Sequence, residues 1–162
     1  MPSSSRVYVR SSRSTSAICP SASSASCATR WARLLVLDAA AAVDLLVGGR
    51  RSAWVEAQLR RSGDICAPHL LDIEVTGAFR RLVGLGAVPE SRAEAALAAL
   101  RALRIARYEH VALIPRIWAL RGSVTAADAA YVALAEALDA PLVTTDARLA
   151  RAPGVSIRIV AP

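Results

Sequence analysis

Hydrophobic and polar positions along residues 34–162 predict strands and helices in alternation. Short apolar runs such as Leu34–Leu37 predict buried strands, and longer stretches with apolar residues every three or four positions predict amphipathic helices. The expected strands span residues 34–38, 64–67, 104–109, 141–145 and 156–160, and the expected helices span residues 39–47, 50–61, 69–84, 89–103, 112–121 and 125–138. Because the two types alternate, we expect an α/β fold with a parallel sheet between helical layers.

Two of the predicted strands end at an aspartate. Asp38 follows the apolar run 34–37, and Asp146 follows the apolar and β-branched segment 142–145. Ligands of open parallel sheets bind outside the carboxyl ends of the strands, so the two carboxylates converge if their strands are neighbours. Taken alone, Asp146 is more simply interpreted as the cap of a short helix at 147–150.

A third aspartate lies in the first turn of the helix predicted at 125–138. Thr125 stands three residues before Asp128, the spacing at which a capping hydroxyl and a first-turn carboxylate satisfy free backbone N–H groups. Asp128 also shares a helical face with Tyr131 and Val132, so it projects toward the side that the helix buries. Capping and membership of a shared site are both open for Asp128.

The long helix predicted at 69–84 carries two further acids, Asp72 and Glu74. They lie about 200° apart around the helix axis, so only one of them readily points into a shared site. Both flank the buried stripe, and periodicity does not choose between them. Asp72 has a structural role available, because a carboxylate in the first turn faces the positive end of the helix dipole. Glu74 has no comparable role.

Composition and charge narrow the class of protein. The chain has 162 residues, 54% of them hydrophobic, with no apolar run long enough to span a bilayer, so we expect one soluble domain without membrane contact. The three Cys show neither zinc nor disulfide spacing, which favours a cytoplasmic location. All twenty basic residues are Arg, which excludes a lysine nucleophile, a Schiff base and a P-loop lysine.

The net charge of +7 is concentrated in residues 1–33, which carry five Arg and no acid, so charge alone is weak support for RNA binding. This Ser- and Arg-rich segment lacks apolar periodicity, and we expect a disordered extension outside the domain at 34–162. It has no apolar core of a secretory signal and bears some resemblance to a mitochondrial transit peptide. We favour a misplaced upstream start over that interpretation.

Three segments together resemble one known family: LLVLDAAAAVDLL at 34–46, APHLLDIEVTGAFRRLV at 67–83 and TAADAAYVALAEALDAPLVTTDARLARAPG at 125–154. In order and spacing they resemble PIN-domain ribonucleases, specifically the VapC type of bacterial toxin. The resemblance implies a PIN-like three-layer α/β/α sandwich around a central parallel sheet. It places the four acidic positions of the family on Asp38, Glu74, Asp128 and Asp146, and thereby selects Glu74 over Asp72.

The resemblance further implies a metal-dependent endoribonuclease toxin that cleaves RNA phosphodiester bonds with a metal-activated water. Mg²⁺ and Mn²⁺ are hard cations that prefer oxygen ligands. Asp38 and Asp128 are then the principal ligands, Asp146 completes the site, and Glu74 binds metal or orients the water. The implied partners are structured RNA, a cognate antitoxin that blocks the acidic pocket and, with the Ala-rich helix 89–103, a second copy of the chain. The candidate RNA contacts are Arg148, Arg80 and Arg81.

One departure from the family pattern favours an alternative function. Many relatives carry Ser or Thr within two residues of the first aspartate, where this chain has Ala39, Ala40 and Ala41. The alternative is a catalytically weak PIN fold that acts as an antitoxin-binding or regulatory module. A third interpretation is a Mg²⁺-dependent phosphotransfer domain, such as a receiver or a haloacid-dehalogenase-like phosphatase. The absence of Lys and of an acid two residues after Asp38 argues against it.

Overall fold

A computed structural model describes residues 34–162, and its centre is a five-stranded parallel sheet. The extension expected at 1–33 lies outside the described residues. The strands are β1 (Leu34–Leu37), β2 (Asp64–Pro68), β3 (Ile105–Tyr108), β4 (Leu142–Val143) and β5 (Ile159–Val160), in the spatial order β3-β2-β1-β4-β5. The continuous apolar run of β1 suits the central position, where both faces of a strand are covered, and all four of its residues are buried.

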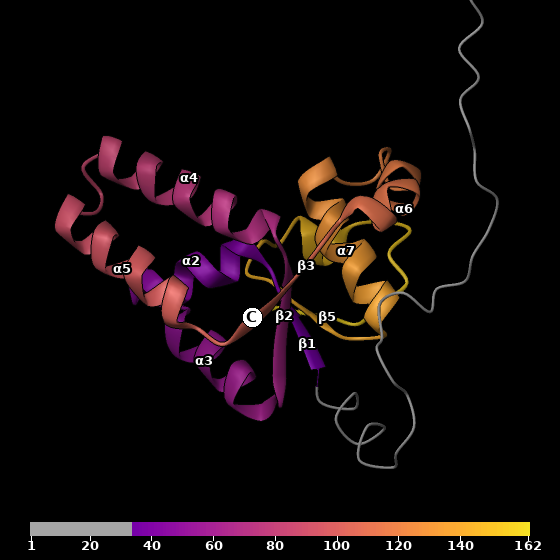
Figure 1. Cartoon of the computed structure of the whole chain (residues 1–162), viewed down its shortest axis with the longest axis horizontal. Coiled ribbons are helices and arrows are strands. Elements are labelled where there is room, and N and C mark those ends of the chain that lie inside the picture. The colour runs from indigo at the N-terminus through magenta and orange to yellow at the C-terminus, as the bar shows by residue number, and fades with distance from the viewer. Residues whose placement is uncertain (1–33) are drawn as a thin grey trace, which may run out of the picture.

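Helices cover both faces of this sheet. The α-helices are α2 (Ala39–Val47), α3 (Ser52–Arg61), α4 (Leu70–Gly84), α5 (Glu90–Ala102), α6 (Ile114–Ala119) and α7 (Ala126–Leu138), with short 3-10 helices η2 (Val111–Leu113) and η3 (Leu149–Arg151). Figure 1 shows α2 to α5 on one side of the strands, and α6 with α7 on the other. The predicted sandwich of helices around a parallel sheet is confirmed.

Helix α7 is the most deeply enclosed helix among the described residues. Every residue from 129 to 135 is buried, because α7 packs on β1, β2 and β4 with one side and on α6 with another. A helix that is apolar around its whole circumference belongs inside a protein. The half-buried Asp128 in the first turn of α7 directly precedes this buried stretch.

Two predicted elements differ from the structure. The single helix expected at 112–121 is divided into η2 and α6, and Pro115 stands in the first turn of α6. Proline lacks an N–H and clashes with the carbonyl four residues earlier, so a helix can begin at Pro115 but cannot run through it. The strand expected at 141–145 pairs only at Leu142–Val143, which frees the residues that follow for side-chain contacts.

Two further predicted elements are shorter or less regular in the structure. The helix expected at 147–150 is a turn that leads into η3, and the strand expected at 156–160 is reduced to β5. Within residues 34–162, no helix is both long and apolar enough to cross a membrane.

Candidate active site

The register of β1 with β4 brings Asp38 beside Thr144. Val36 is paired with Leu142 and Leu37 with Val143, so the next position on each strand is level with the other. Asp38 N donates to the Val143 carbonyl at 3.0 Å, and Thr144 Oγ1 donates to Asp38 Oδ2 at 2.6 Å. The two strands that end near Asp38 and Asp146 are therefore neighbours, which is the condition under which the two carboxylates were expected to converge.

Asp38 is a buried carboxylate at the centre of the site, with only 4% of its surface exposed. Burial raises its pKa to about 6, because a charged carboxylate loses its hydration there, and the hydrogen bond from Thr144 opposes that rise. The negative charges of Asp128 and Glu74 raise the pKa further. These three acids, from β1, α7 and α4, therefore act on one another across a shared space.

Glu74 enters this space from α4 and is anchored by a tyrosine of α7. Tyr131 donates its hydroxyl proton to Glu74 Oε2 at 2.7 Å. Burial raises the pKa of Glu74, the Tyr131 hydrogen bond opposes the rise, Asp128 adds to it, and the Arg81 charge lowers it. Asp72 faces elsewhere and binds Arg107 on β3 through two hydrogen bonds of 2.8 and 3.0 Å. The two acids on α4 thus have separate partners.

Asp128 combines a capping position with a charge that faces the other two acids. Its backbone N–H donates to Thr125 Oγ1 at 3.2 Å, which confirms Thr125 as the N-cap. The Thr125 hydroxyl in turn donates to Asp128 Oδ2 at 2.7 Å. The Asp128 charge also acts on both Asp38 and Glu74. Asp128 therefore both supports the start of α7 and belongs to a group of three acids, Asp38, Glu74 and Asp128, which we call the acidic cluster.

Asp146 begins the turn after β4 and is joined to Asp38 through Thr144. Its N–H donates to Thr144 Oγ1 at 3.0 Å, the hydroxyl that itself donates to Asp38. Asp146 Oδ1 accepts from the Arg148 N–H at 2.7 Å, and this backbone hydrogen bond is the largest cause that lowers the pKa of Asp146. Asp146 therefore stabilises a turn rather than capping the helix expected at 147–150, and it lies one hydrogen-bonded residue away from Asp38.

Comparison with known proteins identifies the family. A family model described as PIN domain matches residues 35–155. Ribonuclease VapC1 of Mycobacterium tuberculosis is 51% identical over 125 residues, which are 76% of this chain and 94% of that protein. This chain belongs to the VapC group of the PIN-domain family. Ribonuclease VapC9 of the same organism is 39% identical over 72% of this VapC-type chain and 88% of its own length.

Two solved structures share the fold of this VapC-type domain. PAE2754 from Pyrobaculum aerophilum superimposes with a TM-score of 0.59 and 25% identity, over 79% of this chain and 83% of that one. VapBC2 from Rickettsia felis, bound to a DNA fragment from their promoter, gives a TM-score of 0.58 at 12% identity, over 79% of this chain and 98% of that one. The α/β/α arrangement of the PIN domain is therefore shared across distant sequences.

Sequence reasoning missed the two neutral side chains that hold the acids of this PIN domain. Thr144 bridges Asp38 and the N–H of Asp146, and it is completely buried. Tyr131 reaches Glu74 from one helical turn beyond Asp128. The Thr-Thr-Asp sequence at the end of a strand and the spacing of three between Asp128 and Tyr131 were the available signals. Neither signal identifies a partner without the three-dimensional arrangement.

The arginines predicted to contact RNA are placed differently with respect to the acids. Arg81 lies close enough for its charge to act on Glu74. The Arg148 side chain is 91% exposed and its Nη2 lies 3.3 Å from Asp146 Oδ2. Arg80 is exposed on α4. Arg51, which was not predicted, donates from Nη1 to the Thr145 carbonyl at 3.2 Å and so reaches the same end of β4.

The acidic cluster fits a hard divalent cation by its chemistry. Carboxylate oxygens are the preferred ligands of Mg²⁺ and Mn²⁺, and a cation would relieve the repulsion from Asp128 and Glu74 that adds to the effect of burial on the pKa of Asp38. Across residues 34–162, however, no group of three or more His, Cys, Asp or Glu is arranged to hold a metal ion. The match is therefore one of ligand type and charge rather than of a preformed coordination shell.

Proposed function

We propose that this VapC-type PIN domain is the ribonuclease toxin of a toxin–antitoxin pair. The observation that carries the proposal is the set of three acids, Asp38, Glu74 and Asp128, whose charges act on one another at the carboxyl ends of the strands. The relatives named Ribonuclease VapC, at up to 51% identity, support RNA as the substrate class.

The proposed reaction is hydrolysis of an RNA phosphodiester bond. Bound Mg²⁺ or Mn²⁺ supplies Lewis acidity and a water of lowered pKa. Asp38 and Asp128 are the proposed principal ligands of that ion. Glu74 binds it as well or orients the attacking water, and Asp146 contributes directly or through water. Thr144 holds one oxygen of Asp38 in place, which would restrict how this carboxylate meets the ion.

The proposed RNA contacts are Arg81, Arg80 and Arg148. A guanidinium matches a phosphate group with two parallel hydrogen bonds and stays charged at all working pH values. Arg81 has the most support, because its charge acts on an acid of the cluster. Arg148 is held at the Asp146 turn but presents most of its side chain to solvent.

The proposed protein partners are a cognate antitoxin and a second copy of this chain. An acidic pocket attracts a cation, so an antitoxin that inserts an Arg side chain would both neutralise the cluster and exclude RNA. For the homodimer, α5 leaves small residues exposed that allow close approach of another helix. These residues are Ala95, Ala98, Ala99 and Ala102.

Expression in a bacterial host tests the toxin function. The wild-type domain is expected to arrest growth, co-expression of the small gene next to it should relieve the arrest, and Asp128→Asn should not arrest growth at all. Asparagine keeps the hydrogen-bond acceptor near Thr125 and removes the charge. Arrest that persists in Asp128→Asn would contradict the nuclease mechanism. Antitoxin binding without arrest by the wild type would favour the binding module.

A further inference from the structure

Tyr131 makes a contact in this site that neither the family comparison nor the acidic residues account for. Tyr131 is 1% exposed, and its hydroxyl reaches from α7 to Glu74 on α4, 57 positions away in the chain. The oxygen–oxygen distance of 2.7 Å is typical of a strong hydrogen bond from a hydroxyl to a carboxylate. A phenylalanine would fill the same space, so packing alone does not require the hydroxyl.

The Tyr131 hydrogen bond joins helices that otherwise pack in separate groups. Helix α4 packs mainly against α2, α5 and β2, whereas α7 packs against α6 and the sheet. Figure 1 shows α4 and α7 on opposite sides of the strands. The hydrogen bond from Tyr131 therefore fixes the position of Glu74 relative to α7. Asp128 lies one turn before Tyr131 on α7, so the same contact fixes Glu74 relative to Asp128.

The Tyr131 hydroxyl is the donor in this hydrogen bond, because an ionised carboxylate has only acceptor oxygens. Glu74 must then accept through Oε2, and its second oxygen is directed by that bond. Without the donor, the half-buried carboxylate faces like charges from the other two acids with less to hold it in place.

We propose that Tyr131 is a positioning residue for the ribonuclease reaction, and that its hydroxyl orients the Glu74 carboxylate toward the space shared with Asp38 and Asp128. The inference rests on the proposed function, because it assigns Tyr131 a part in the same site. It predicts that the hydroxyl matters to metal binding and RNA cleavage, whereas the aromatic ring matters to folding.

Tyr131→Phe tests the hydroxyl alone. We expect the variant to fold, and to bind Mn²⁺ between about 10- and 100-fold more weakly than wild type by calorimetric titration, the usual effect of losing a residue that orients a metal ligand. RNA cleavage should fall by a similar factor. Tyr108→Phe is the matched control, because it removes a hydroxyl that contacts the Cys66 thiol on β2 instead of an acid of the cluster. It should bind Mn²⁺ as wild type does.

A double-mutant cycle separates positioning from a structural role. In a Glu74→Gln background, removal of the Tyr131 hydroxyl should cause no further loss of Mn²⁺ affinity, since the carboxylate through which it acts is gone. Equal losses in both backgrounds would overturn the proposal, and so would wild-type Mn²⁺ affinity and cleavage in Tyr131→Phe. A wild type that cleaves no RNA refutes the proposed function, and one that binds no Mn²⁺ refutes both.

An NMR measurement on the wild-type protein tests the same proposal even if Tyr131→Phe fails to fold. The chain has three tyrosines, so ¹³C labelling at tyrosine Cζ gives a simple spectrum. Addition of Mg²⁺ should shift the Tyr131 resonance, because the strength of its hydrogen bond changes when Glu74 engages the ion, and should leave that of Tyr108 in place. An unmoved Tyr131 resonance at saturating Mg²⁺ would overturn the proposal.

Discussion

Thr144 supports Asp38 with a hydrogen bond of 2.6 Å from a position 106 residues further along the chain. The three alanines that follow Asp38 offer no hydroxyl, and Thr144 supplies one from the neighbouring strand. The Ala39–Ala41 run was the sequence feature that favoured a catalytically weak module. With a hydroxyl already bonded to the first aspartate, that argument against activity loses its basis.

Thr144→Val should weaken the fold when Asp38 is ionised. The substitution keeps the β-branched shape but removes both the donor to Asp38 and the acceptor of the Asp146 N–H, so the pKa of Asp38 should rise further above about 6. A buried acceptor that loses its partner costs roughly 1–3 kcal/mol, measurable as a lower free energy of unfolding in urea at neutral pH. Thr145→Val on the adjacent buried residue is the control. Equal destabilisation by the two variants would show that the hydrogen bond is not the cause.

The stability of the metal-free protein should carry a pH dependence that comes from Asp38. Its pKa is raised from 3.8 to about 6 in the folded state, so the folded protein binds a proton more tightly than the unfolded chain between these values. The contribution of Asp38 is therefore most favourable below the lower value and is lost as pH rises through about 6, a change of about 3 kcal/mol. Unfolding in EDTA at several pH values measures it.

Asp38→Asn is the variant that isolates this effect, since asparagine does not titrate. Relative to wild type, its free energy of unfolding should increase as pH rises from about 4 to about 7. Carboxylates with lowered pKa values, such as Glu136 beside Arg116, contribute with the opposite sign in both proteins and cancel in the comparison. A difference between the two proteins that does not change with pH would contradict the raised pKa.

Divalent cations should stabilise the wild type more than Asp128→Asn. Repulsion within the acidic cluster makes the metal-free site unfavourable, and an ion that binds only the folded state raises the melting temperature by mass action. At an ion concentration about 100 times the Kd, the gain is about 2.7 kcal/mol. Removing the Asp128 charge should abolish most of this rise in melting temperature. Thermal melts with Mg²⁺ or Mn²⁺ test it, and equal shifts in the two proteins would count against a shared site.

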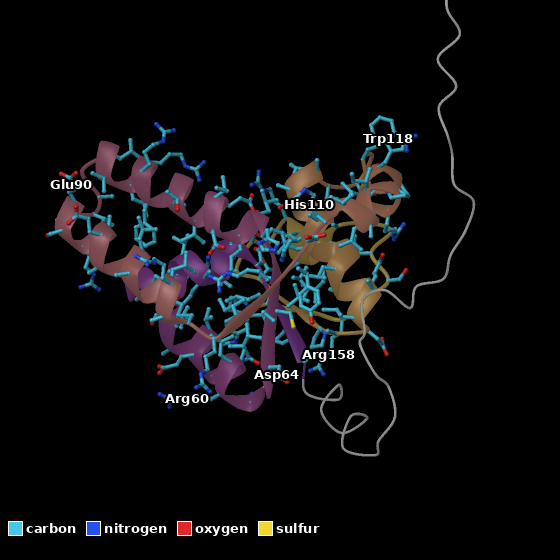
Figure 2. The ribbon with its side chains drawn as sticks, in the orientation of Figure 1. Arg60, Asp64, Glu90, His110, Trp118 and Arg158 are labelled. Atoms are coloured by element: carbon cyan, nitrogen blue, oxygen red, sulfur yellow. The ribbon has the colours of Figure 1, made fainter. Side chains whose placement is uncertain are left out.

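Arg81→Gln should weaken RNA binding without regard to RNA sequence. A lost phosphate contact lowers affinity about uniformly and reduces the salt slope of binding by about 1. The matched control is Arg60→Gln on α3, where the arginine pairs with Glu56. Figure 2 shows Arg60 and Asp64 near the end of the molecule where β2 begins, and His110 near the end where β3 finishes. If both variants lose the same affinity and slope, Arg81 has no specific part in binding.

The sequence was sufficient for the fold and for the positions of the acids, but not for their partners. Apolar runs that end at Asp38 and Asp146 predicted two buried strands of a parallel sheet, because strands covered on both faces are continuously apolar. Whether these two strands were neighbours was left open by the sequence. Periodicity could not choose Glu74 over Asp72, since both flank the same stripe. The choice came from family resemblance, and the structure supplies a physical difference: Asp72 binds Arg107, whereas Glu74 binds Tyr131.

Long-range contacts account for what the sequence missed. The hydrogen bond from Thr144 to Asp38 joins residues 106 positions apart, and the one from Tyr131 to Glu74 joins residues 57 positions apart. No local sequence pattern encodes such a pairing. The break between η2 and α6 was a different kind of error. Pro115 was visible in the sequence, and its restriction to the first turn of a helix was sufficient to divide the predicted element.

The most direct test of the proposed metal-dependent nuclease compares RNA cleavage by the wild-type protein and by Asp38→Asn. Wild-type protein in Mn²⁺ should cleave total bacterial RNA at a small number of sites, and EDTA should abolish the reaction. Asp38→Asn retains an oxygen that can accept from Thr144, and its rate should fall by more than about 100-fold, because loss of a ligand costs more than loss of an outer partner. Cleavage by Asp38→Asn at the wild-type rate, or undiminished cleavage in EDTA, would contradict the proposed mechanism.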